Sequence, residues 1–431
     1  MTSPISPRRP VVREPLGRLH VLGLAVCVLA AFVARVGVRL LSGPDEYRMG
    51  AYDFYLRIAQ TWVEGFGFCV EPSFQCSLRM PLYPMLLAPF VATGRLYPWL
   101  VVLQAAMGAA LVLVAWAMAR PLFGHRAALV AAVLAAVNPY AVVHDTALQD
   151  TVLVNLLVGL GSLVLLHAGR TRRESLSEAG YWLSGALLGL AVMTTVRVAL
   201  LLPAAGLWVL VSGRHSLSTA LRNAILVALP ATLLIGGWVV RNWTLTGAPV
   251  LTTESGESLW AANNAWTFDY LPTRSIDLAV GRSYTELQGA ELEAFRPLIG
   301  YELKSDRFLG QLGWTWIRQH PSTAAWRAVR KVWMPLNGRI SPARGASDSF
   351  GYAAFFMPVH LAAFVGLVRS WRRSAAHQMT PYLIAGFLLT TAVYWSHTSH
   401  RSLIDVWLFV YAAGALSWVD AWRRRAHAPA G

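Results

Sequence analysis

Apolar stretches close to 20 residues long recur along the whole chain, and short polar segments separate them. A helix needs about 20 apolar residues to cross the roughly 30 Å of hydrocarbon in a bilayer, and it satisfies its own backbone hydrogen bonds there. The pattern therefore predicts an all-α polytopic membrane protein with about ten transmembrane helices. Their expected positions are 19–40, 97–119, 125–144, 150–168, 180–196, 198–212, 223–241, 351–368, 380–396 and 403–419.

The arginines predict how these helices are oriented. Every second connection between them is rich in arginine, as the positive-inside rule requires of cytoplasmic segments. Both termini are then expected to be cytoplasmic, and only four of the 22 acidic residues fall on that side: Glu14, Glu174, Glu178 and Asp420. The arginines in the cytoplasmic connections are Arg8, Arg9, Arg13, Arg18, Arg120, Arg126, Arg170, Arg172, Arg173, Arg214, Arg222, Arg369, Arg372, Arg373, Arg423, Arg424 and Arg425.

The same pattern divides the chain into a core and two tails. We expect a disordered basic tail over 1–18, a transmembrane domain over 19–420, and a basic tail over 421–431. The first apolar run is long for a signal-peptide core, so it is interpreted as a retained membrane helix. Extracytoplasmic loops are expected near 42–97 and 242–350, and polar side chains gather in them.

The long loop near 242–350 contains two aromatic stripes at helical spacing. One stripe is Phe308, Leu312 and Trp316; the other, beyond Pro321, is Trp326, Val329 and Trp333. These stripes predict interfacial helices that lie on the outer leaflet. The alternative is that both are ordinary amphipathic helices packed on the bundle. The apolar stretch after the RMPLYP run, which begins at Arg79, is short for a span and is expected to be a helix that re-enters the membrane or lies along the interface.

Composition narrows the class of protein further. The chain is 55% hydrophobic and 14% charged, whereas a soluble domain carries about 25% charged residues. Its net charge of +15 comes from short arginine clusters between apolar runs, which argues against nucleic acid as a partner. Cys69 and Cys76 lie together in the first outer loop, where a disulfide is expected. Cys27 lies in the first apolar run and is interpreted as a core residue.

Carboxylates beside the outer end of the first span are candidates for catalysis. Asp45 and Glu46 come where this span leaves the bilayer, and Asp53 follows eight residues after Asp45. Such groups can accept a proton or hold a metal ion. The competing interpretation is an acidic helix start that complements the helix dipole. Asp150 opens another span, where a role in substrate binding competes with a favourable interaction with the helix dipole.

Of the arginines expected on the outer side, four are candidates for binding a phosphate: Arg79, Arg197, Arg241 and Arg401. A guanidinium group matches the oxygens of a phosphate, and ionisable groups close to the membrane are functional candidates. The competing interpretation for each one is snorkelling to the interface. His397 and His400 are candidates for hydrogen bonds to a phosphate or for acid catalysis.

Several other chemistries have no motif in the chain. A GxxxxGK[ST] loop, a GxGxxG run after a strand and an HExxH pair are all missing from the sequence. The cytoplasmic connections are too short to form a nucleotide-binding domain. The energy for any reaction is therefore expected to come from the substrate, which favours an activated lipid donor.

Several stretches together resemble a known superfamily. They are PDEY, YLRIAQTWVEGFGF followed by RMPLYPMLLA, LQDTVL, GLAVMTTVRVALLLP, GGWVVRNWTLTGAPVLTTESGESLWAANN and IRQHPSTAAWRAVRKVWMPL. In their order, the chain resembles the GT-C superfamily of integral-membrane glycosyltransferases, and most closely the branch of protein O-mannosyltransferases and the aminoarabinose transferase of lipid A. The likeness covers roughly 19–416. Two features depart from it: the spacing from Asp45 to Tyr55 is longer, and the last motif is reduced to HRSLIDVW.

This resemblance implies a function on the extracytoplasmic face of a bacterial cytoplasmic membrane. A sugar would move, with inversion, from a polyprenyl-phosphate donor to a glycan, lipid or protein acceptor. One of Asp45, Glu46 and Asp53 would act as the general base, and Arg197, Arg241, Arg401 and Arg79 would hold the donor phosphate, with or without a divalent metal ion. The candidates for substrate binding are Tyr55, Asp150, His400, Asn263 and Asn264.

Other classes of protein explain the sequence less well. A transporter or flippase of lipid-linked sugars would share the spans and the outer arginines, but transporters are typically built from repeated halves with broken helices at the midplane. A ligase or polymerase that uses a diphosphate-linked glycan would differ only in its donor. A non-catalytic scaffold leaves the acidic loop and the outer arginines unexplained.

Overall fold

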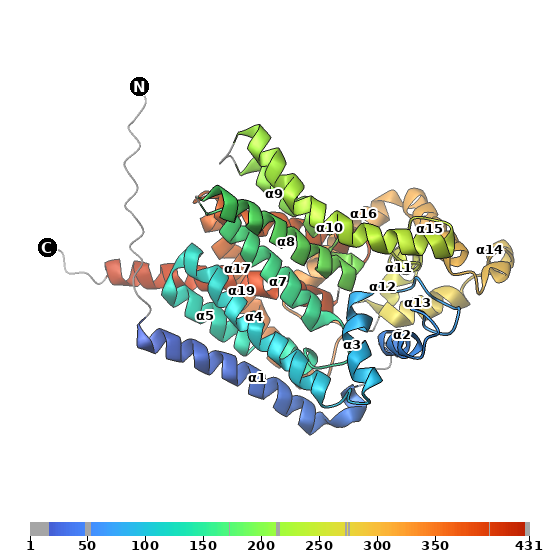
Figure 1. The fold of residues 1–431 in the computed structure, drawn as a ribbon, viewed down its shortest axis with the longest axis horizontal. Helices are drawn as coiled ribbons and strands as arrows, with labels where there is room; N and C mark the ends of the chain where they lie inside the picture. Colours follow the sequence, from blue (N-terminus) through green and yellow to red (C-terminus); the bar gives the residue numbers. More distant parts are fainter. Residues whose placement is uncertain are drawn as a thin grey trace.

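The computed structural model describes residues 17–47, 53–171, 173–212, 216–271, 274, 276–395 and 397–426. Most of the expected basic tails, 1–16 and 427–431, lies outside the described residues. Within the described ranges the chain forms helices and no β-strand, with a single isolated β-bridge between Glu71 and Phe74. The long helices lie side by side, and the short ones gather at one end of the bundle (Figure 1).

The helices that build the bundle are α1 (Arg18–Tyr47), α4 (Trp99–Phe123), α5 (His125–Ala136), α6 (Pro139–His144), α7 (Thr151–Ala168), α8 (Glu174–Thr194), α9 (Leu201–Val211), α10 (Leu217–Thr246), α17 (Ala346–Ser370), α18 (Ala375–Val393) and α19 (Thr398–Ala426). The connections contain α2 (Asp53–Val63), α3 (Leu82–Ala92), η2 (Val196–Val198), α11 (Ser255–Ala262), α12 (Thr267–Tyr270), α13 (Ile276–Thr285), α14 (Gly289–Phe295), η3 (Arg296–Leu298), α15 (Glu302–Gln319) and α16 (Pro321–Leu336).

The prediction of an all-α polytopic membrane protein is confirmed, and each of the ten expected spans overlaps one α-helix or, at 125–144, two α-helices. Six of these helices in the described residues are long and apolar enough to cross a membrane: α1, α4, α7, α8, α10 and α17. The expected span at 125–144 is divided, because α5 ends before Asn138 and α6 begins at Pro139. Since α5 and α9 contain only 12 and 11 residues, they are shorter than a full crossing requires.

Small residues let the central helices approach closely. Gly185 and Gly189 lie four apart on α8 and face α10, and a Cβ atom at Gly185 would lie 2.0 Å from the carbonyl oxygen of Val227. Membrane helices associate largely through such close packing, because lipid tails are as apolar as leucine. On its other side α8 packs against α7, so α7, α8 and α10 form one layer of the bundle.

Helix α1 is held by charged residues within the bundle. Only 11% of its spanning window is buried, yet Arg35 points inward and its Nε lies 2.8 Å from Oδ2 of Asp145. Arg39, one turn further, donates to Thr146 and to the carbonyl of Val143. These two arginines therefore tie the most exposed span to the connection before α7.

The long connections gather at the end of the bundle opposite the start of α1 (Figure 1). Helices α2 and α3 pack together, and α3 is the short apolar helix that the sequence predicted. Helix α15 turns Phe308 and Leu312 toward a cluster around Trp260, so its stripe packs on the protein. Helix α16 leaves Trp326 and Trp333 each 63% exposed. The two stripes thus behave differently, and only that of α16 is free to meet lipid.

Candidate active site

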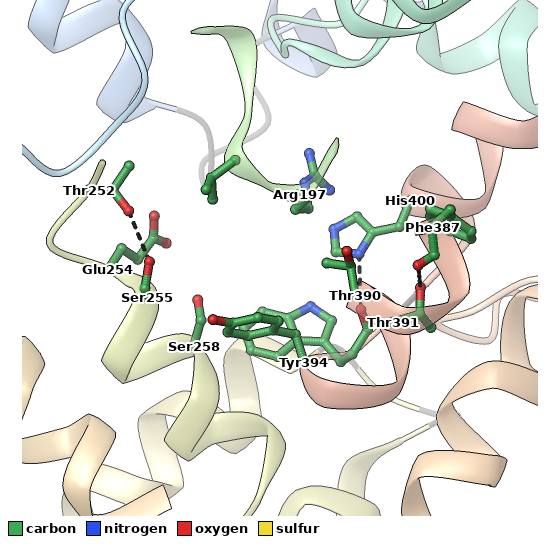
Figure 2. A pocket seen from close by; sticks show the side chains of 12 residues that line it. Arg197, Thr252, Glu254, Ser255, Ser258, Phe387, Thr390, Thr391, Tyr394 and His400 are labelled. Atoms are coloured by element: carbon green, nitrogen blue, oxygen red, sulfur yellow. Dashed lines mark hydrogen bonds between the residues drawn. The ribbon is translucent and has the colours of Figure 1, made fainter. Parts of the chain in front are cut away.

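A cavity of about 120 Å³ lies at the loop-bearing end of the bundle. Its walls come from η2, from the segment that leads into α11, from the end of α18 and from the start of α19. Figure 2 shows Thr252 and Glu254 on one side, His400 on the other, and Arg197 between them. The lining residues are Val196, Arg197, Thr252, Glu254, Ser255, Ser258, Phe387, Thr390, Thr391, Tyr394, Trp395 and His400.

Arg197 lies in the sharp turn between α8 and α9. The turn places its guanidinium group at the cavity with 29% of the side chain exposed. Its Nε donates to Thr195 Oγ1 over 3.1 Å, and NH2 lies 3.6 Å from Oδ2 of Asp150. These contacts leave N–H groups of the guanidinium directed toward the cavity, where they can donate hydrogen bonds to a phosphate oxygen.

Asp150 connects Arg197 to the first outer loop. It occupies the N-cap position of α7, but its carboxylate does not cap that helix. Instead Oδ2 accepts a 3.0 Å hydrogen bond from the hydroxyl of Tyr55. Burial, followed by the charge of Asp150, raises the pKa of Tyr55 well above its usual value. The phenol therefore stays protonated as a donor, and the carboxylate of Asp150 contacts Tyr55 and Arg197 instead of the backbone N–H groups of α7.

Arg79 lies against the ring of Tyr55 and pairs with Glu254, a residue that lines the cavity. Its NH1 atom lies 2.5 Å from Oε2 of Glu254, and the two side chains are 26% and 27% exposed. The guanidinium carbon also lies over the rings of Phe54 and Tyr55. Burial alone would lower the pKa of Arg79, but Glu254, Tyr55 and Asp150 raise it above its usual value. Arg79 is thus already neutralised by a carboxylate that lines the cavity.

The remaining walls supply aromatic rings and hydroxyl groups. Tyr394 and Trp395 follow α18, and the indole Nε1–H of Trp395 is buried and has no hydrogen-bond partner among the described residues. A buried donor without a partner costs free energy unless a ligand or water accepts from it. The ring of His400 lies 4.1 Å from that of His397. Burial, followed by the charge of Arg197, lowers the pKa of His397 to about 3, so this imidazole is neutral.

Arg241 is used to shape the first outer loop. It donates to the carbonyl oxygens of Cys76 and Phe68, and its guanidinium carbon lies 4.6 Å from the ring centroid of Trp238. The same loop contains the Cys69–Cys76 disulfide. Since Arg241 is absent from the residues that line the cavity, its contacts indicate a support for the loop rather than a phosphate ligand.

Arg401 and the two asparagines are also occupied by protein groups. Arg401 is 1% exposed, pairs with Asp405 over 3.0 Å and lies 3.6 Å above the ring of Phe356. Asn263 donates to the carbonyls of Leu259 and Val393. Asn264 organises the turn before α12 through its bonds with the backbone of Trp260 and Trp266. None of these three residues lines the cavity.

Of the three candidate carboxylates at the first outer loop, the structure describes the side chain of Asp53 alone. Asp45 and Glu46 belong to the outer end of α1, beyond the non-helical Gly43, and their side chains lie outside the described part of the structure. Asp53 begins α2 and does not line the cavity. Among the described residues no group of three or more His, Cys, Asp or Glu side chains is arranged to hold a metal ion.

Sequence reasoning found part of this cavity and missed the rest. It identified Arg197 and His400, together with their neighbours Arg79, Tyr55 and Asp150. It missed Glu254, although the ESGES run opens α11 and a charged residue at a helix start in an outer loop was a usable signal. It also missed Trp395 and the hydroxyl groups of α18, because ordinary span residues carry no local mark of facing a cavity.

Comparisons with known proteins agree with this architecture. Residues 81–238 match the family model described as dolichyl-phosphate-mannose-protein mannosyltransferase. The archaeal oligosaccharyltransferase AglB from Archaeoglobus fulgidus, in complex with an inhibitory peptide and a dolichol-phosphate, is 16% identical with a TM-score of 0.55. The alignment covers 95% of this chain and 51% of that protein, so the chain spans about half the length of its structural relative. No match is found among curated protein sequences.

Two further structures extend the comparison. The Archaeoglobus fulgidus oligosaccharyltransferase in complex with Zn and sulfate is 15% identical with a TM-score of 0.53, over 94% of this chain and 50% of that protein. ArnT from Cupriavidus metallidurans, bound to undecaprenyl phosphate, is 16% identical over 93% of this chain and 78% of that protein, but its TM-score of 0.39 is too low to support a shared fold by itself. The chain therefore shares the fold of the archaeal oligosaccharyltransferase over almost its whole length, and the resemblance that its sequence predicted is confirmed.

Proposed function

We propose that this protein is a membrane glycosyltransferase that moves a sugar from a polyprenyl-phosphate donor to an acceptor hydroxyl. The observation that carries the proposal is the cavity at the end of the spans, with a partly exposed Arg197 on one wall and an unpartnered indole N–H on another. A cation for a phosphate, an aromatic surface for a sugar ring and hydroxyl groups beside them suit a lipid-linked sugar. The isoprenoid tail can remain in the bilayer while the sugar enters this cavity.

The charge of the cavity favours a donor with one phosphate. In the described part of the chain, Arg197 is the single arginine that lines the cavity, and Arg79 beside it is neutralised by Glu254. A polyprenyl-phosphate sugar is a phosphodiester with one negative charge. A diphosphate-linked glycan carries more charge and would require further cations or a metal ion. The match is therefore closest for the monophosphate donor.

The proposed reaction is a direct displacement. A carboxylate takes the proton of the acceptor hydroxyl, the oxygen forms a bond to the anomeric carbon, and the bond from that carbon to the phosphate oxygen breaks. Configuration inverts, and polyprenyl phosphate leaves with an added negative charge that Arg197 stabilises. Asp45, Glu46 and Asp53 remain the candidate bases, and Glu254 joins them as the carboxylate that lines the cavity.

The setting of the reaction follows from the orientation of the chain. From the arginine pattern we infer that the loop-bearing end, and with it the cavity, is extracytoplasmic. The family resemblance supports a bacterial cytoplasmic membrane as its location. In the structure the start of α1 and the end of α19 lie at the opposite end (Figure 1). The acceptor is then a glycan, lipid or protein that is exposed on that outer face.

A transfer assay tests the proposal. The purified chain, reconstituted in liposomes, would receive radiolabelled undecaprenyl-phosphate sugars, with a membrane extract as acceptor. Wild type would run beside Asp45→Asn, Glu46→Gln, Asp53→Asn and Glu254→Gln. We expect label to move from one donor, and one substitution to lower the rate at least 100-fold without unfolding the protein, because loss of a general base costs about 10²–10⁴-fold.

The assay also separates the alternatives. If no label reaches any acceptor but the lipid-linked sugar changes leaflet, the protein is a transporter and the transferase proposal is wrong. If transfer requires a diphosphate-linked donor, the reaction class stands and the argument from the charge of the cavity fails.

A further inference from the structure

Helix α16 has two faces of opposite character. Trp326, Val329 and Trp333 are exposed on one face, whereas Lys331 on the other is completely buried. Lysine is almost never fully buried without a partner of opposite charge. Among the described residues no carboxylate forms an ion pair with Lys331. Burial, followed by the charge of Arg327, lowers the pKa of this lysine to about 7.

Carbonyl groups take the place of a carboxylate. The Nζ atom of Lys331 lies 3.4 Å from the carbonyl oxygen of Ala262, the last residue of α11, and 3.0 Å from that of Val393, the last residue of α18. It also donates over 3.1 Å to Oδ1 of Asn263. The last carbonyls of a helix lack partners within the helix and form the negative end of its dipole. One ammonium group therefore caps two helix ends.

Asn263 strengthens this junction. While its Oδ1 accepts from Lys331, its Nδ2 donates over 2.9 Å to the carbonyl of Val393 and over 2.8 Å to that of Leu259. The asparagine side chain therefore bridges the ends of the same two helices. We call this junction of Lys331, Asn263 and the Val393 carbonyl the shared cap.

The two capped helices form facing walls of the cavity. Helix α11 contributes Ser255 and Ser258, and α18 contributes Thr390 and Thr391, with Tyr394 directly after the capped carbonyl of Val393. We propose that Lys331 is a positioning residue that fixes the separation of these walls, and so the fit of the lipid phosphate and sugar between them. The inference rests on the proposed function for the identity of the ligand, whereas the shared cap itself does not depend on it.

The test compares Lys331→Met with Lys304→Met in the full-length chain in lipid nanodiscs. Lys304, exposed on α15, is the only other lysine in the sequence and provides a matched control. We expect Lys331→Met to speed amide hydrogen exchange in both 255–263 and 388–395 and to weaken binding of undecaprenyl phosphate at least 10-fold. In the transfer assay the KM for the donor should rise more than kcat falls, as expected when binding groups are displaced. Lys304→Met should match wild type.

The hydrogen-exchange and binding results test the positioning role of Lys331 and the proposed function separately. Wild-type exchange in both segments together with unchanged affinity for undecaprenyl phosphate in Lys331→Met overturns the positioning role. If wild type itself does not bind undecaprenyl phosphate, the proposed function fails, and the exchange data still decide whether Lys331 joins the two helix ends.

Two measurements remain decisive if Lys331→Met does not fold. Acetylation of the native wild-type protein should modify Lys304 at least 10-fold faster than Lys331, because the buried amine is held by three acceptors; equal rates would overturn the shared cap. Asn263→Ala removes one of these acceptors and keeps the lysine. It should speed exchange at both helix ends, and protection identical to wild type would count against the bridge.

Discussion

Arg197 and Arg401 show how differently two similar arginines can be used at the same end of one bundle. Both follow an apolar span, and both were expected to hold a phosphate. Arg197 is 29% exposed at the cavity and lies 3.6 Å from Asp150, whereas Arg401 is 1% exposed and pairs with Asp405 at 3.0 Å. His400, one position before Arg401, lines the cavity.

The difference teaches that the direction of a side chain decides its role. Successive residues on an α-helix point about 100° apart, so His400 and Arg401 on α19 face different surroundings. Arg401 meets a carboxylate four positions along its own helix, on the same face. Arg197 lies in a short turn, and its nearest carboxylate comes from another helix. An arginine that pairs with a carboxylate on its own helix stabilises the fold. An arginine in a turn beside a cavity can also bind a ligand.

The largest expected effect is on stability, from Arg401→Met. The substitution leaves Asp405 buried without its cation, which typically costs about 3–5 kcal/mol. We expect a large fall in the thermal unfolding midpoint in detergent, and a substantial recovery in the double variant Arg401→Met/Asp405→Leu. Donor affinity of the double variant should stay near wild type. A loss of affinity comparable to that of an Arg197 variant would return Arg401 to the binding site.

The next effect is on binding, from Arg197→Gln. A hydrogen bond to a charged group contributes about 1.5–3 kcal/mol, so affinity for undecaprenyl phosphate should fall about 10–100-fold. The thermal midpoint should change less than in Arg401→Met, because the ion pair to Asp150 is longer and partly exposed. Titration calorimetry in detergent measures the affinity, with Arg197→Lys as the variant that keeps the charge. Unchanged affinity in Arg197→Gln would remove this residue from the site.

A smaller effect is expected from Arg241→Met, the third arginine of the set. Loss of its hydrogen bonds to the carbonyls of Cys76 and Phe68 should cost about 1–2 kcal/mol of stability. Donor affinity should change less than 3-fold, because Arg241 does not line the cavity. Thermal unfolding and the same calorimetry check both parts. A 10-fold loss of affinity would show that this arginine reaches the donor phosphate.

The smallest effect concerns how the stability of the protein depends on pH through Glu257, which lies next to the cavity residues of α11. Burial, followed by the charge of Glu254, raises the pKa of Glu257 to about 7 from its usual 4.5. Between these values the folded chain binds more protons at this group than the unfolded chain does, so stability falls as pH rises from about 4.5 to 7. Glu257→Gln should flatten this slope and shift the midpoint at pH 8 upward by a few degrees. An unchanged profile would place this carboxyl group in water.

The sequence by itself determined the class of the fold. Hydropathy is a local property that accumulates over about 20 residues, so the positions of α1, α4, α7, α8, α10 and α17 could be predicted without knowing their neighbours. The short helix α3, the break at Pro321 and the cysteines that form the disulfide were also local features. Arg197 was identified because a charge between two apolar stretches is costly wherever the rest of the chain lies.

The tertiary structure alone decided which of these residues share a site. The stripe on α15 faces Trp260 and the stripe on α16 faces outward, although their spacing is alike, because residues of α11, α13 and α14 pack against the first. Glu254, Trp395 and Lys331 take their roles from partners between 62 and 175 positions away, or from the cavity beside them. Such pairings depend on how helices pack in three dimensions, and the period of a single helix records only which face is apolar, not what that face will meet.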